Sequence, residues 1–121
     1  MKNIIAEVRD GILVATIFGN IDGQTVSGLQ SALAPHLEET SSATFDVTAV
    51  PYMSSAGFRL LLLMYRNVTM RGGRMAIVGL AEEIRETMEL TGFLEFFLLA
   101  SSLDEAIAQV QHVAIDHAGS C

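Results

Sequence analysis

The sequence is poor in cysteine, and its one cysteine, Cys121, stands at the last position. A single thiol cannot form a disulfide within the chain and has no second cysteine for a metal cluster. The histidines supply no metal site either, because His36, His112 and His117 show no ligand spacing with one another or with Cys121. The sequence therefore predicts no disulfide framework, no bound metal and no other cofactor.

Basic residues are also few. Seven Lys and Arg stand against 14 Asp and Glu, so the formal net charge is −7. A surface that binds DNA or RNA must neutralise phosphates, and this excess of acid argues against direct nucleic-acid binding. No run of 18 apolar residues occurs, and the start of the sequence lacks the features of a signal peptide. We therefore expect a soluble cytoplasmic protein with no membrane insertion.

Several catalytic motifs are missing. The sequence has no Gly-x-Ser-x-Gly elbow, no Gly-x-x-x-x-Gly-Lys-Ser/Thr phosphate loop and no Gly-x-Gly-x-x-Gly dinucleotide loop. Asp46 is a lone carboxylate with no second acid or histidine nearby in sequence, so we expect it to order the backbone around it rather than transfer a proton. The sequence predicts a binding protein and no enzyme.

Apolar residues, in contrast, are abundant. Half of the 121 residues are hydrophobic and only 17% are charged, which is enough to fill one core with some left for the surface. The length suits one domain, predicted to span residues 1–116, with residues 117–121 as a frayed tail. The surplus of apolar residues fits a partner-binding surface or a homodimer interface.

Strand-like and helix-like segments alternate along the chain. Strands are predicted at 4–8, 12–18, 43–50 and 74–79 and within 95–99, and helices at 24–37, 54–70, 81–90 and 102–115. The first two strands form a hairpin, and the later strands are each reached through a helix. This order predicts an α/β protein with a mixed sheet of four to five strands, mainly parallel, and about four helices packed on it as a layer.

Three helix ends carry recognisable capping residues. Asp22 is placed to cap the helix that follows it, and Gly72 and Gly73 to end the second helix. Ser102 and Glu105 have the spacing of a capping box, in which each side chain accepts a backbone N–H of the other residue.

The segment 46–61 carries the most information about function. It leads from a buried strand through a short loop to Ser54 and Ser55 at the start of a helix. Free backbone N–H groups and the positive end of the helix favour an anion there, so the place suits a phosphate. The alternative is that one serine simply caps the helix.

The sequence resembles the STAS domain family, in particular its free-standing bacterial anti-sigma factor antagonists. Five landmarks in the family's order carry the resemblance: Gly19 to Asp22 with Thr25, the signature from Asp46 to Gly57, Gly72 with Gly73, Leu90 to Phe93, and Ser102 to Ala106. The resemblance implies the STAS fold. It also implies a protein that binds an anti-sigma factor, which doubles as a serine kinase, and so releases a sigma factor.

The resemblance also implies which residues act. Phosphorylation by the kinase would fall on Ser55 and break the complex, and a serine phosphatase would reverse it. The implied partner-binding residues lie in two segments: Asp22, Thr25, Ser54, Ser55, Ala56, Gly57 and Phe58. Asp22 contacts the kinase in this interpretation, or caps the first helix, or does both.

The chain departs from the family pattern at one place. The family commonly has an acidic residue before the two hydroxyl residues, whereas here Ser54, Ser55 and Ala56 follow Met53. Ser54 is therefore a rival phosphorylation site. The departure also keeps open a second function, a STAS scaffold subunit of a stressosome-like or lipid-transport assembly that is not phosphorylated. A nucleophilic role for Ser55 would need a base that the sequence does not show.

The predicted second helix is apolar nearly all round, since Leu60 to Met64 are five consecutive apolar residues. A helix that faces one core uses about three of every seven positions. The sequence leaves two interpretations open: the helix is buried on both sides, or it contributes to a docking face.

Overall fold

The structure is a computed structural model that describes the backbone of residues 3–119 and the side chains of residues 3–111. The strands in this part of the chain are β1 (Ile4–Arg9), β2 (Ile12–Phe18), β3 (Ser42–Ala49), β4 (Met75–Val78) and β5 (Leu98–Ala100). The helices are α1 (Val26–Leu37), α2 (Ser55–Met70), α3 (Glu82–Thr91) and α4 (Leu103–Gly119), with a short 3-10 helix, η1 (Phe93–Phe96), before β5. The predicted α/β class is confirmed.

The five strands lie side by side in chain order, β1-β2-β3-β4-β5. β1 and β2 form the predicted antiparallel hairpin, and the pairs from β2 to β5 are parallel. Asp10 and Gly11 join the hairpin at φ 53° and 78°, the left-handed conformations that a tight type I′ turn requires. Each parallel pair needs a crossover, so the loops that follow β2, β3 and β4 all lie at one edge of the sheet.

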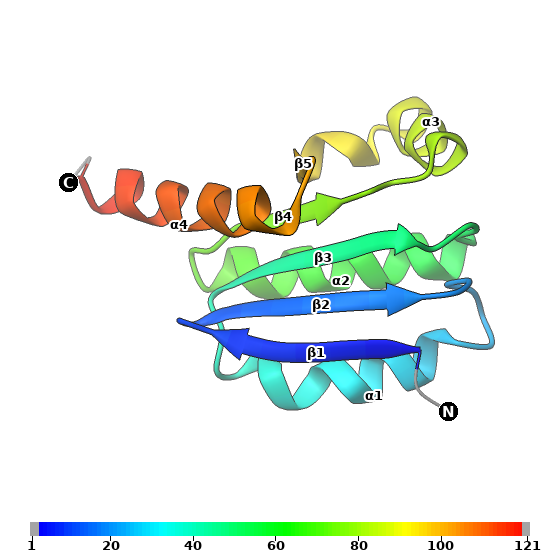
Figure 1. Cartoon of the computed structure of the whole chain (residues 1–121), viewed down its shortest axis with the longest axis horizontal. Helices are drawn as coiled ribbons and strands as arrows, with labels where there is room; N and C mark the ends of the chain where they lie inside the picture. Colours follow the sequence, from blue (N-terminus) through cyan, green and yellow to red (C-terminus); the bar gives the residue numbers. More distant parts are fainter. Residues whose placement is uncertain (1–2, 120–121) are drawn as a thin grey trace.

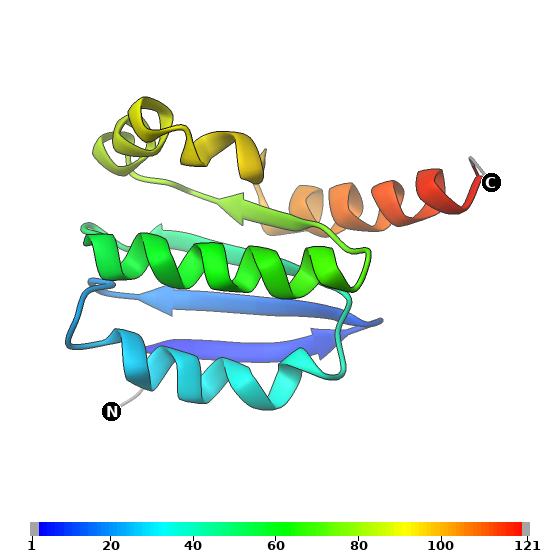
Figure 2. The same ribbon diagram turned by 180° about the vertical axis from the view of Figure 1, so that it is seen from behind.

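The helices cover both faces of the sheet. α1 and α2 pack on one face, in front of the strands in Figure 2, and α4 packs across β3, β4 and β5 on the other face (Figure 1). β2 is apolar on both of its faces: Leu13 and Ile17 belong to the core under α1 and α2, whereas Ile12 and Val14 belong to a second cluster under α4. A strand with two apolar faces must be covered twice. The single layer of helices that the sequence predicts is therefore split in two.

The region before α4 differs most from the prediction. A strand was expected within 95–99, but residues Phe93–Phe96 form η1 and β5 is Leu98–Ala100. Aromatic packing fixes this arrangement, since the Tyr65 ring of α2 lies 5.1 Å from Phe96 and 5.8 Å from Phe97, measured between centroids. Such tertiary contacts override local strand propensity.

The helix ends agree with the predicted caps to different degrees. Past α2, the Gly73 N–H donates to the Val68 carbonyl at 2.7 Å and Gly72 has φ 79°, so the predicted glycine cap is confirmed as a Schellman motif. At α4, Ser102 Oγ accepts the Glu105 N–H at 3.1 Å as predicted, but the Glu105 carboxylate bonds Ser101 and not Ser102.

Helix α4 continues to Gly119, past the end near residue 115 that the sequence predicts. Residues 120 and 121, the end of the predicted frayed tail, lie outside the described residues. Within the described residues, no helix is both long and apolar enough to cross a membrane.

Candidate functional site

The candidate site lies where the loops after β2 and β3 meet at the edge of the sheet (Figure 1). Two backbone hydrogen bonds join these loops: the Ile21 N–H donates to the Tyr52 carbonyl at 3.0 Å, and the Ser54 N–H donates to the Ile21 carbonyl at 2.9 Å. Ile21 and Met53 also form an isolated parallel bridge. The two predicted partner-binding segments, some 30 residues apart in sequence, are thereby held side by side.

Asp22 and Thr25 close the first loop on themselves. Asp22 Oδ1 accepts the N–H groups of Gln24 at 3.0 Å and Thr25 at 3.2 Å, and the Asp22 N–H donates to Thr25 Oγ1 at 3.0 Å. Helix α1 begins at Val26 with Thr25 at its N-cap position. The predicted start near residue 24 is two residues early, but the predicted capping contacts are present: Asp22 Oδ1 accepts two N–H groups of the turn that leads into α1, and the Val26 N–H donates to the Asp22 carbonyl at 3.0 Å.

Ser54 and Ser55 differ in accessibility. Ser54 is the N-cap residue of α2, yet its side chain makes no capping hydrogen bond, and its Oγ is buried without a hydrogen-bond partner among the described residues. Ser55 is the first residue of α2 and is exposed. The capping role that the sequence offers for one of these serines is not observed. Ser55 is the serine whose hydroxyl another protein can reach.

Gly57 lets α2 approach the two loops. It is buried, and a Cβ atom at this position would lie 2.5 Å from Met53 Cγ and 2.9 Å from the Ile21 carbonyl oxygen. Both distances are shorter than carbon and oxygen atoms tolerate without movement. Gly57 is therefore placed to position the loops, and a buried glycine offers a partner no side chain to contact.

Ala56 and Phe58 complete the predicted partner-binding segment, and both are half-buried. The Phe58 ring packs 6.1 Å from the Phe93 ring and also lines a cleft of about 140 Å³ between the loop before α2 and helix α3. No sequence pattern predicts this cleft, because α3 and the loop approach each other only in the folded chain.

The start of α2 can accept an anion. Its first turn contains no acidic residue, and the N–H groups there have no partner within the helix. Arg59 is exposed and lies four residues after Ser55, on the same side of the helix. No sequence motif singles out Arg59, and its spacing of four residues from Ser55 is the only signal in the sequence that connects the two.

The apolar run in α2 is mostly buried. Leu60, Leu61 and Met64 are at most 4% exposed, and Leu62 packs against the core. Leu63 alone in this run is exposed, at 38%. Packing in the core therefore explains most of this apolar run. Leu63 is the one residue of the run that is exposed enough to contribute to a docking face.

Asp46 orders the backbone at the end of β3, as the sequence predicts. Asp46 Oδ1 accepts the Thr48 N–H at 3.0 Å and the Thr48 hydroxyl at 2.6 Å. Among the described residues, no group of three or more His, Cys, Asp or Glu side chains is arranged to hold a metal ion.

Comparisons with known proteins agree with this architecture. BtrV of Bordetella bronchiseptica, which is named as an anti-sigma factor antagonist, is 30% identical over 100 residues, covering 82% of this chain and 86% of BtrV. A crystal structure of an anti-sigma factor antagonist from Mycobacterium paratuberculosis has a TM-score of 0.78 at 27% identity, over 89% of this chain and 92% of the other.

A more distant structure, that of SpoIIAA in its unphosphorylated form, has a TM-score of 0.77 at 20% identity, over 90% of this chain and 96% of the other, and supports the fold alone. The STAS domain model matches residues 3–106, a range that contains the sheet, both site loops and the start of α4. The chain therefore belongs to the STAS domain family.

Proposed function

We propose that the protein is an anti-sigma factor antagonist whose action is controlled by phosphorylation of Ser55. In its unphosphorylated form it binds an anti-sigma factor that is also a serine kinase, and so releases a sigma factor. The observation that carries the proposal is the exposed Ser55 at the open start of α2, beside the loop of Asp22 and Thr25. The similarity to BtrV supports the proposal.

Phosphorylation would act on the interface and leave the fold in place. A phosphate adds about −1.5 to −2 charges, and the start of a helix stabilises such an anion. A partner surface that fits the neutral serine would then have to desolvate the new charge, which is costly without a matching cation. We therefore expect binding to be lost where the partner surface that covers Ser55 is apolar or acidic.

The residues proposed to take part in partner binding do so in different ways. Ser54, Ser55, Ala56 and Phe58 lie on or next to the surface around the phosphorylation site, whereas Gly57 acts by allowing the close approach of the loops. Asp22 both orders its turn and remains half-buried at the surface, where it can meet a cation of the kinase.

The test uses the cognate kinase with ATP on wild type, Ser54→Ala and Ser55→Ala, followed by mass spectrometry to map the phosphate. Wild type and Ser54→Ala should each gain one phosphate, and Ser55→Ala none. Calorimetry should show that Ser55→Ala binds the kinase constitutively and that Ser55→Asp binds poorly, with similar melting temperatures for the two variants.

Two results would contradict the proposal in different ways. Phosphorylation that persists in Ser55→Ala moves the switch to Ser54 or to another residue. A wild-type protein that is isolated from its own cells without phosphate, and that the kinase does not modify, favours the scaffold function in a larger assembly. A serine phosphatase that restores binding of the phosphorylated protein would complete the cycle.

A further inference from the structure

The cleft next to Phe58 lies beside the proposed phosphorylation site, and phosphorylation of Ser55 gives it no role. Its volume is about 140 Å³, room for a few water molecules or one aliphatic side chain. It is lined by the loop before α2, the first turn of α2 and one face of α3: Pro51, Tyr52, Met53, Phe58, Glu83, Ile84 and Thr87.

The inner part of the cleft is apolar. Met53 and Ile84 are each 5% exposed, and Phe58 is half-buried against Phe93. Tyr52 stands at the edge with 54% of its surface exposed, in the loop that leads directly to Ser54 and Ser55. An exposed tyrosine over an apolar hollow is typical of a place where one side chain of a partner is bound.

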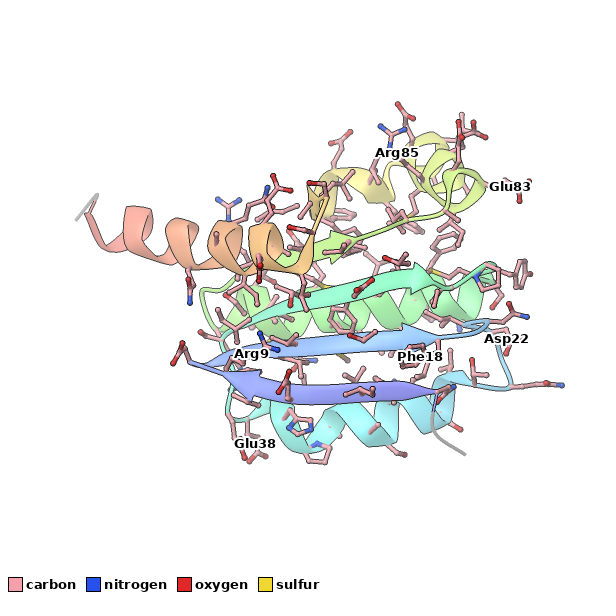
Figure 3. The ribbon with its side chains drawn as sticks, viewed as in Figure 1. Arg9, Phe18, Asp22, Glu38, Glu83 and Arg85 are labelled. Atoms are coloured by element: carbon pink, nitrogen blue, oxygen red, sulfur yellow. The ribbon has the colours of Figure 1, made fainter. Side chains whose placement is uncertain are left out.

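The polar edge of the cleft is acidic. Glu83 is exposed and lines the cleft, and among the described residues only Arg9 and Glu7 form an ion pair, so Glu83 has no cationic partner there. Arg85, the basic residue of α3, lines a different hollow near β5. Figure 3 shows Glu83 and Asp22 at the same end of the molecule, where the site loops lie. A ligand of this cleft therefore meets negative charge.

We propose that this cleft binds an apolar side chain of the anti-sigma factor that stands next to a lysine or arginine. The apolar side chain fills the space between Phe58 and Ile84, and the cation lies at the Glu83 carboxylate. This proposal rests on the proposed function, because the cleft continues the surface around Ser55 through Met53 and Phe58. It names the chemistry by which the partner is recognised.

The cleft can be tested first with a small probe, the dipeptide acetyl-Leu-Arg-amide, in an NMR titration of the whole chain. The dipeptide should shift the amide signals of Tyr52, Met53, Ile84 and Thr87 at millimolar concentration, and the effect should weaken at high salt. Acetyl-Leu-Glu-amide should shift them far less. Equal shifts from both dipeptides, or none from either, would overturn the proposal.

The second test compares Glu83→Gln with Glu82→Gln in binding to the purified anti-sigma factor kinase. Both residues are exposed in the first turn of α3, and both variants lose one negative charge there, but only Glu83 lines the cleft. Glu83→Gln should weaken binding about two- to fivefold, as expected for an exposed charge pair, and Glu82→Gln should leave it nearly unchanged. Failure of wild type to bind the kinase would refute the proposed function, whereas normal binding with equal effects of the two variants would refute the cleft alone.

Discussion

Two helices of this protein have a pair of serines at their start, and the two pairs make different contacts. Before α4, the Ser101 N–H and hydroxyl donate to the Glu105 carboxylate at 2.6 and 2.7 Å, and Ser102 Oγ accepts the Glu105 N–H. At the start of α2, the N-cap residue Ser54 makes no capping hydrogen bond, and the first helical residue, Ser55, is exposed. The Ser-Ser pair before α4 is therefore held by hydrogen bonds that order the helix start, whereas Ser55 at α2 is accessible to another protein.

The difference comes from the side chain of Glu105, one of two acidic residues in the first turn of α4. At α4, the Glu105 carboxylate folds back onto the N–H and the hydroxyl of Ser101, so the chain places its own anion beside the helix start, which we call closed. At α2, no acidic residue stands in the first turn, and the helix start stays open. We therefore expect phosphorylation at the serine pair of α2, where the first turn supplies no anion of its own, and not at the pair before α4.

The open site depends on the close packing of α2 against the loops, and Gly57→Ala should disturb that packing most. The new methyl group would meet the Ile21 carbonyl, which cannot move without the loop, so we expect a loss of about 1–3 kcal/mol in the free energy of unfolding. Gly28→Ala, in α1 with no atom within 4 Å of the new Cβ, should instead stabilise by about 0.4–1 kcal/mol. Urea denaturation measures both, and effects of the same sign would contradict the packing role of Gly57.

The serine pairs themselves provide the next comparison. Ser102→Ala removes a capping hydrogen bond and should cost about 0.5–2 kcal/mol of stability. Ser54→Ala removes a buried hydroxyl without a protein partner among the described residues, and should change stability by no more than about 0.5 kcal/mol. Thermal unfolding of the two variants and of wild type measures both losses of stability. Equal losses would mean that Ser54 caps α2 in solution after all.

A smaller effect is expected of Arg59 on the pKa of a phosphate at Ser55, at the open start of α2. A phosphate on Ser55 lies four residues before this exposed arginine, a spacing at which opposite charges on a helix attract by about 0.3–0.5 kcal/mol. The arginine should therefore lower the second pKa of the phosphate, and Arg59→Gln should raise it again in a phosphorus NMR titration. Arg66→Gln, which removes an exposed charge two turns further along α2, is the control and should leave the titration unchanged.

The sequence predicts those parts of the fold that depend on neighbouring residues. Alternation from Ile4 to Val8 and the turn at Asp10 and Gly11 define the hairpin, and the glycine after α2 defines where that helix ends. The family resemblance adds the order of the site segments. Each of these signals lies within a few residues of sequence, which is why periodicity and capping rules detect it.

The remaining features depend on contacts between distant segments. The 3-10 helix at Phe93–Phe96 follows from packing on Tyr65, and the difference in exposure between Ser54 and Ser55 follows from the bond of the Ser54 N–H to Ile21. The cleft joins Met53 to Ile84, some 30 residues along the chain. No local pattern carries such information.

The smallest expected effect concerns the closed helix start at α4, where the protonation of Glu105 should make the stability of the fold depend on pH. The Ser101 N–H and then the Ser101 hydroxyl hold the pKa of the Glu105 carboxyl below its ordinary value of 4.5. Because the pKa is lower in the folded chain, this interaction stabilises the fold fully above the ordinary value and is lost as the pH falls through the folded value. The effect is modest, since the carboxylate is fully exposed.

Melting temperatures of wild type and Glu105→Gln between pH 7 and pH 3 test this prediction. Glutamine keeps an acceptor oxygen but no charge, so wild type should melt higher at pH 7 and lose that advantage in acid. Asp104→Asn removes a charge from the same turn of α4, where the acid also favours the positive helix end. If the two variants showed the same dependence on pH, the hydrogen bonds from Ser101 would add nothing to the general attraction of the helix end for an acid, and the contrast between the two serine pairs would lose its electrostatic basis.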